Sequence, residues 1–176
     1  MHRALAIVAL GLGVAAALAG GASRLSPRRA ATIDLAALAS AVSREADHVT
    51  ALDLGAWIKD RKPRLRVIDV HSKEEFDRDH IPTAEPIPLE ALVNTPFSRD
   101  ETLVLYSEGG AHAAQGWVFL RARGYEHVYF LRGGLAEWND EVMSPAKPSD
   151  ISRYFGGVVW PPSAAPGTTP RRRNGC

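Results

Sequence analysis

A chain of 176 residues has room for one domain with short extensions. Its composition, 45% hydrophobic and 23% charged, is typical of a globular protein and excludes wholesale disorder. A formal net charge of +1 gives no basis for a nucleic-acid-binding protein, and a single cysteine, Cys176, excludes an intramolecular disulfide and a cysteine metal cluster.

Residues 1–23 are typical of a signal peptide or an N-terminal membrane anchor. A basic start is followed by residues 4–23, which carry no charged side chain. The alternative is a buried helix, but this stretch lacks polar residues to cover its outer face. One arginine precedes the segment and three follow it, which leaves the orientation open. We expect an exported or membrane-anchored protein with its domain in the periplasm or otherwise outside the cytoplasm; the alternative is an anchored domain that faces the cytoplasm.

Residues 24–50 are expected to form a linker and a short helix. Ser26 and Pro27, followed by two arginines, are typical of a linker. From residue 33 to residue 45, Leu35, Leu38 and Val42 recur at spacings of three and four, which predicts an amphipathic helix. Asp34 stands at the position of an N-cap.

From residue 51 to residue 142, strand patterns alternate with helix patterns. Apolar and β-branched runs predict strands at 65–70, 102–106 and 128–131, with a weaker one around Ile87 and Leu89. Helical spacing predicts helices at 52–61, 73–78, 112–123 and 135–142, with Trp57, Trp117 and Trp138 as packing residues. The alternation predicts an α/β fold with a largely parallel sheet and helices on both faces. In such sheets, ligands bind beyond the carboxyl ends of the strands.

Residues 143–176 are rich in Pro, Gly, Ser and Thr and are expected to form a C-terminal tail. Within it, residues 154–160 are apolar enough to dock on the domain. The terminal Cys176 is expected to be a free thiol, with an intermolecular disulfide as the alternative if the protein is exported.

One loop of the predicted sheet is a candidate for binding an anion or a partner. It joins the strand at 102–106 to the next helix and consists of Ser107, Glu108, Gly109, Gly110, Ala111 and His112. Its glycines allow the main-chain N–H groups to point inward, a shape that suits an anion at a helix N-terminus.

The order of the motifs along the chain resembles the rhodanese-like domain family. The motifs are Ile68–Phe76, His80–Ala84, Leu105–Ser107, Gly124–Tyr129 and Leu131–Trp138, of which the last, Leu-x-Gly-Gly-x-x-x-Trp, is the most specific. The resemblance covers about half of the chain. It implies a five-stranded parallel sheet flanked by helices on both faces, in agreement with the alternation of strands and helices.

The resemblance also implies where the chemistry of the family takes place. Active sulfurtransferases of this family carry a cysteine directly after the fourth strand, and here Ser107 stands at that position. A thiolate accepts sulfur as a persulfide, whereas a serine hydroxyl is a far weaker acid and holds no stable sulfane sulfur. Active members commonly carry arginine or lysine in this loop, but here the loop has Glu108 and His112, and His71 stands where an arginine often follows Asp-Val. Asp69 and His71 are expected to support the loop.

Three functions are compatible with these residues. The first is a rhodanese-like module without sulfurtransferase activity that binds a protein partner or a small anion through the Ser107 loop. The second is a sulfurtransferase or sulfur carrier that uses Cys176. The third is a hydrolase in which His112 activates Ser107, a role that also requires a third orienting group. None of the three calls for a metal or a cofactor.

Overall fold

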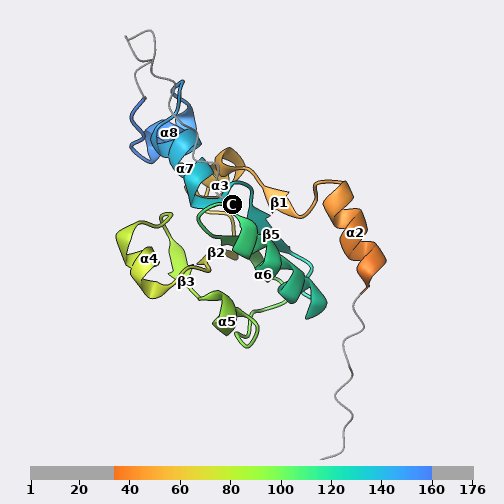
Figure 1. The fold of residues 1–176 in the computed structure, drawn as a ribbon. Helices are drawn as coiled ribbons and strands as arrows, with labels where there is room; N and C mark the ends of the chain where they lie inside the picture. Colours follow the sequence, from red (N-terminus) through yellow and green to blue (C-terminus); the bar gives the residue numbers. More distant parts are fainter. Residues whose placement is uncertain (1–33, 160–176) are drawn as a thin grey trace, which may run out of the picture. The chain divides into compact units, whose positions relative to one another are not determined.

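The computed structural model describes residues 34–159. Its elements are, in chain order (Figure 1), α2 (Leu35–Ser43), β1 (His48–Val49), α3 (Ala51–Lys59), β2 (Leu65–Asp69), α4 (Lys73–Arg78), β3 (Ala84–Pro86), α5 (Leu89–Leu92), β4 (Thr102–Tyr106), α6 (Ala111–Ala122), β5 (Val128–Leu131), α7 (Gly134–Trp138), the π-helix η1 (Asn139–Met143) and α8 (Asp150–Tyr154). In the part of the chain that is described, no helix is both long and apolar enough to cross a membrane. The expected signal peptide or membrane anchor at 1–23 and the terminal Cys176 lie outside it.

The five strands form one parallel sheet in the order β1-β5-β4-β2-β3. The central strand β4 pairs along its whole length with β2, from Thr102 beside Leu65 to Tyr106 beside Asp69. Parallel neighbours require crossover connections, and helices form these connections here. The α/β fold, which the alternation predicted, and the five-stranded parallel sheet, which the resemblance implied, are both confirmed.

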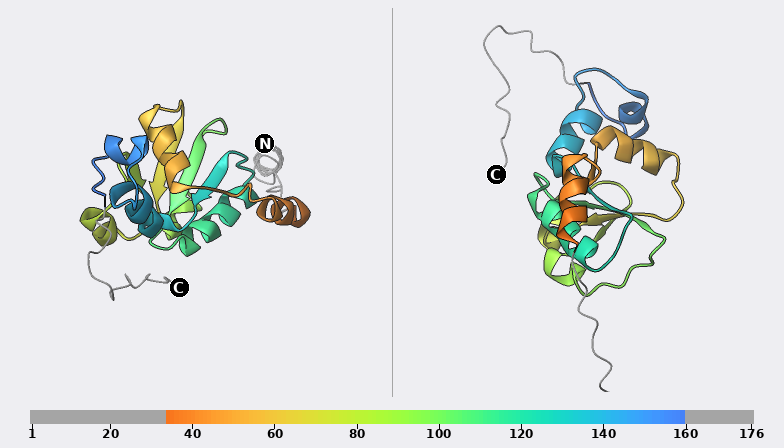
Figure 2. Two further views of the ribbon diagram at one scale, coloured as in Figure 1. Left: turned by 90° about the horizontal axis from the view of Figure 1, so that it is seen from above. Right: turned by 90° about the vertical axis from the view of Figure 1, so that its right-hand side faces the viewer.

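Apolar side chains pack on both faces of the sheet, because successive residues of a strand point to opposite sides. In β2, Ile68 belongs to the cluster that includes α6, whereas Val67 belongs to the cluster that includes α3 and α7. Trp117 is buried in the first cluster and Trp138 in the second, and Trp57 packs against the second, so their predicted packing role is confirmed. Figure 2 shows helices on both sides of the sheet.

Local end signals set the limits of two helices. The Asp34 carboxylate accepts a hydrogen bond from the Ala37 N–H at 2.9 Å, so the predicted N-cap of α2 is confirmed. Gly124 follows α6 with a φ of +81°, the left-handed conformation that a residue beyond the end of a helix adopts.

A further strand is present next to Ile87, as expected, but it lies earlier in the chain than the sequence indicated and does not include Leu89. The edge strand β3 ends at Pro86, and Leu89 begins the short helix α5 after Pro88. The spacing of two between Ile87 and Leu89 fits a strand, but the spacing of three from Leu89 to Leu92 fits a helix. Because the apolar run is short, its periodicity does not decide between the two.

Two further elements were not expected from the sequence. Strand β1 has two residues, too few to show an alternating pattern. Helix α8 lies within the Pro- and Gly-rich region that was expected to be a tail from residue 143. Its C-cap, Phe155, packs edge-on against Trp138 at 5.0 Å between ring centroids, and the second core therefore extends beyond residue 142.

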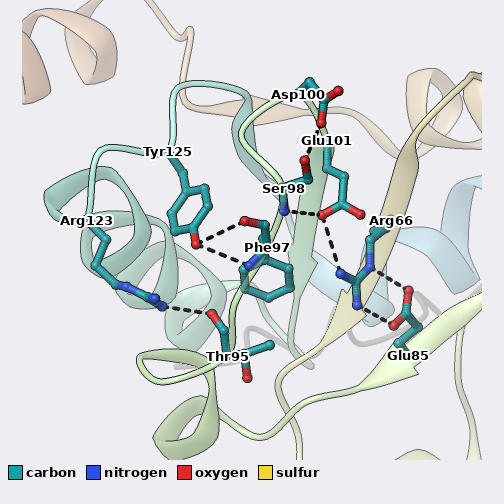
Figure 3. A network of polar contacts seen from close by, with 9 residues as sticks. All are labelled: Arg66, Glu85, Thr95, Phe97, Ser98, Asp100, Glu101, Arg123 and Tyr125. Atoms are coloured by element: carbon teal, nitrogen blue, oxygen red, sulfur yellow. Dashed lines mark hydrogen bonds and ion pairs between the residues drawn. The ribbon is translucent and has the colours of Figure 1, made fainter.

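Polar contacts anchor the segment between α5 and β4 (Figure 3). The Tyr125 hydroxyl accepts a hydrogen bond from the Phe97 N–H at 3.2 Å and donates one to the Phe97 carbonyl at 3.4 Å. Arg66 of β2 forms a two-pronged ion pair with Glu85 of β3, at 2.9 and 2.6 Å, and a longer contact with Glu101. These contacts hold β2, β3 and the segment before β4 together, and none of them involves the Ser107 loop.

Candidate functional site

The carboxyl ends of β2 and β4 lie side by side at the point where the chain connections diverge. From β2 the chain crosses to β3 on one side, and from β4 it crosses to β5 on the other. Asp69 is the register partner of Tyr106, and the Val70 N–H donates to the Tyr106 carbonyl at 3.0 Å. Asp69 and His71 are therefore brought beside Ser107, at the position where open α/β sheets bind ligands.

Ser107 is buried at the start of the loop. Only 3% of the residue is exposed, and its hydroxyl accepts a hydrogen bond from the Ala113 N–H at 3.3 Å. Gly110, with a φ of +88°, turns the chain into α6. In the described part of the chain no hydrogen bond joins Ser107 to His112, which is exposed in the first turn of α6.

The Ser107 loop packs directly against the turn after β5. The Leu135 N–H donates to the Ser107 carbonyl at 2.9 Å, and the Ala136 N–H donates to the Glu108 carbonyl at 3.0 Å. Gly134 has a φ of +61°, and a Cβ atom there would overlap the Ser107 carbonyl oxygen. The Gly-Gly pair of the last motif therefore allows two backbone segments to approach closely.

Several main-chain N–H groups of the loop have no partner in the described part of the chain. Among residues 34–159, the N–H groups of positions 108–112 have no hydrogen-bond acceptor. These N–H groups are free to donate to a ligand, and whether they point inward, as the glycines suggested, stays a prediction.

Asp69 and His71 form a buried pair behind the loop. Asp69 is fully buried, and its Oδ1 atom accepts from the His71 main-chain N–H at 2.8 Å. The same oxygen lies 2.7 Å from Nδ1 of the imidazole, close enough for an ion pair but out of line for a hydrogen bond. The Asp69 carboxylate raises the pKa of His71 against the opposing effect of burial, and Glu75 and Glu108 raise it further.

Tyr106 contacts the pair of Asp69 and His71. Its ring lies edge-on to that of His71, and its hydroxyl accepts a hydrogen bond from the Ile81 N–H at 3.1 Å. Burial, together with the neighbouring Asp69 carboxylate, raises the pKa of Tyr106, and the phenol therefore stays neutral.

A pocket of about 350 Å³ opens beside the loop. It is lined by His71, Glu75, Arg78, Asp79, Glu108, Leu135 and Asn139. The Asn139 amide donates to the Asp79 carboxylate at 3.0 Å, which links the end of α4 to η1. The pocket lining therefore includes three carboxylates, one guanidinium and one imidazole. Across residues 34–159, no group of three or more His, Cys, Asp or Glu side chains is placed to hold a metal ion.

The family model for the rhodanese-like domain matches residues 50–141, which is more than half of the chain. The chain belongs to the rhodanese-like domain family. This result confirms the resemblance that the motifs indicated.

Curated relatives match part of this rhodanese-like chain. A protein named tRNA uridine(34) hydroxylase from Erwinia tasmaniensis is 26% identical over 103 residues, which are 50% of this chain and 29% of that protein. The mitochondrial protein HIGH ARSENIC CONTENT 1 from Arabidopsis thaliana is 28% identical over 48% of this chain and 59% of its own length. The uncharacterized protein YqhL from Bacillus subtilis is 28% identical over 46% and 66%. The chain spans less than two thirds of each of these relatives.

Solved structures of rhodanese-like domains are also similar to this chain. One from Staphylococcus aureus is 27% identical, with a TM-score of 0.49 over 54% of this chain and 93% of that one. Another, from Anabaena sp., is 23% identical, with a TM-score of 0.49 over 69% and 87%.

The rhodanese-like fold brings the expected supporting residues Asp69 and His71 to the Ser107 loop. Of the loop residues, only Glu108 also lines the pocket. Apart from His71, sequence reasoning missed the other pocket residues, because α4 and η1 are 60 positions apart where Asp79 meets Asn139. The role of the Ser107 loop in binding stays a prediction.

Proposed function

We propose that this chain is a rhodanese-like binding or regulatory module without ordinary sulfurtransferase activity. The observation that carries the proposal is Ser107, a buried hydroxyl at the position where active members of the family carry the nucleophilic cysteine. A hydroxyl is a far weaker acid than a thiol, and an oxygen cannot store a sulfane sulfur for transfer.

The charge of the site also supports this proposal. No lysine or arginine lies in positions 107–112, and Glu108 lines the pocket. A second negative charge 4 Å from a carboxylate is repelled by roughly 4 kcal/mol at an effective dielectric of 20. A thiosulfate dianion would meet this repulsion, and the same argument favours a protein partner over the small anion that the loop suggested.

Sulfur transfer through Cys176 is the second candidate function. It is favoured by the similarity of the chain to a protein named tRNA sulfurtransferase from Desulfurococcus amylolyticus, which is 39% identical over 41% of this chain and 14% of that protein. In this candidate the terminal thiol replaces the cysteine that the loop lacks. A serine hydrolase has less support, because the Ser107 hydroxyl accepts from a main-chain N–H and no histidine is hydrogen-bonded to it among the described residues.

A sulfurtransferase assay on the full chain tests the proposal. The assay follows the transfer of one sulfur atom from thiosulfate to cyanide, which yields sulfite and thiocyanate. We expect no turnover above the uncatalysed rate. We expect Ser107→Cys alone to stay inactive because Glu108 repels the donor, whereas Ser107→Cys combined with Glu108→Arg should gain activity and thiosulfate affinity.

Three further measurements separate the candidates. Ser43→Cys places a thiol on the exposed end of α2 and should give no turnover. Turnover by the native chain that Cys176→Ser abolishes would overturn the proposal in favour of the sulfur carrier. Labelling of Ser107 by a fluorophosphonate would overturn it in favour of the hydrolase.

A further inference from the structure

We propose that the pocket beside the Ser107 loop holds the basic side chain, lysine or arginine, of a protein partner. The inference rests on the proposed function, because it names the chemical class of ligand that the binding module takes. It follows from the charges, the buried histidine and the apolar contact that meet at this pocket.

The pocket lining is negative overall. Carboxylates of Glu75, Asp79 and Glu108 outnumber the single guanidinium of Arg78, and the balance stays negative even when His71 is protonated. The Arg78 Nε atom donates to a carbonyl of its own helix at 3.4 Å and is directed toward the backbone of α4. An anion is therefore repelled by this lining, and a cation is attracted.

His71 is a second, independent sign of a ligand with hydrogen-bond donors. The residue lines the pocket although only 9% of it is exposed. Its Nδ1 atom is turned toward Asp69 without an in-line hydrogen bond, and Asp69 Oδ2 has no hydrogen-bond partner among the described residues. Above the raised pKa of His71 the imidazole is neutral, the carboxylate favours its proton on Nδ1, and the opposite nitrogen, Nε2, is then an acceptor. A lysine or arginine N–H matches such an acceptor.

The shape of the pocket suits a long side chain with an apolar stem. Leu135 is the one apolar residue among those that line it, and the other six lining residues are polar or charged. The stems of lysine and arginine pack on apolar surface while their charged heads contact polar groups. A pocket of about 350 Å³ is at the small end of ligand sites, in keeping with one side chain that projects from a partner.

A pair of peptides tests the proposal on the full chain. The probe is acetyl-Gly-Gly-Arg-Gly-Gly-amide, and its control carries glutamine in place of arginine. We expect the arginine peptide, and not the glutamine peptide, to shift amide NMR signals of α4 and of positions 107–112. The affinity should fall as ionic strength rises, because salt screens the attraction.

Charge-neutral variants locate the contact. Glu108→Gln or Asp79→Asn alone should weaken binding about two- to fivefold, as expected for a partly exposed ion pair. Glu74→Gln removes the same charge from an exposed position of α4 that does not line the pocket, and it should leave the affinity unchanged.

Three results would overturn the inference. The first is equal binding of the two peptides or no binding of either. The second is the same loss of affinity from Glu74→Gln as from Glu108→Gln. The third is tighter binding of spermidine than of the arginine peptide, which would assign the pocket to a small amine. The sulfurtransferase assay decides the proposed function separately, because an inactive chain that binds no basic peptide refutes only the pocket assignment.

Discussion

Gly134 is the residue whose replacement tests the packing of the site most directly. Alanine at this position would have to keep a φ of +61°, which costs an L-residue about 1 to 2 kcal/mol. Its Cβ would overlap the Ser107 carbonyl oxygen and lie 2.7 Å from both the Glu108 carbonyl oxygen and the Gly110 nitrogen. The two backbone segments must then separate.

The size of the effect follows from the contacts that separation breaks. The Leu135 and Ala136 N–H groups donate to the Ser107 and Glu108 carbonyls, and each bond contributes about 0.5 to 1.5 kcal/mol. Together with the strain, Gly134→Ala should lower the free energy of unfolding by about 2 to 5 kcal/mol. Urea titration followed by tryptophan fluorescence measures this change, since Trp138 at the end of α7 is only 1% exposed.

Two matched glycines separate strain from overlap. Gly156 has a φ of +76°, but a Cβ there meets no atom within 4 Å, so Gly156→Ala should show the strain alone, about 1 to 2 kcal/mol. Gly109 lies in the Ser107 loop without a positive φ and with open space around its Cβ, and Gly109→Ala should change stability little. Equal losses from Gly134→Ala and Gly156→Ala would refute the close approach of the two segments.

Two further substitutions report on other contacts. Tyr125→Phe leaves the buried Phe97 N–H without its acceptor and should lower the free energy of unfolding in urea by about 1 to 3 kcal/mol. The same change at the exposed Tyr154 should cost little. A loss below about 0.5 kcal/mol at Tyr125 would contradict the contact. The folded state raises the pKa of His71 above its ordinary value of about 6.5, so the stabilisation from its protonation is complete below that pH and is lost as the pH rises through the raised pKa. In His71→Gln, the slope of the unfolding free energy against pH in this window should become smaller. His127→Gln changes an exposed histidine and should leave the slope unchanged. An unchanged slope in His71→Gln would argue against the pair with Asp69.

The pattern of residues was sufficient to predict the architecture. Continuous apolar runs at β2, β4 and β5 indicate strands buried on both faces, and helical spacing between them indicates crossovers. Such signals lie within a few positions of one another, so they are readable without the fold. The same reasoning fails for β1 and α5, where two to four residues are too few for a period to be distinguished.

The candidate site was predicted only in part. The place of Ser107 after β4 follows from the order of the motifs, and Asp69 and His71 follow from the end of β2. The contribution of α4 and η1 to the pocket cannot be predicted from the sequence, because Asp79 and Asn139 become neighbours only after β2 and β4 pair and their connections diverge.

The sequence by itself determined the class of fold and the serine, Ser107, that directly follows the central strand. Only the tertiary structure decided the environment of that loop: a close-packed glycine turn on one side and a pocket with more carboxylates than cations on the other. The physical reason is the distance along the sequence over which each feature is determined. Secondary structure depends on residues three or four positions apart, whereas the charge of a pocket is a sum over side chains that the folded sheet brings together from distant positions.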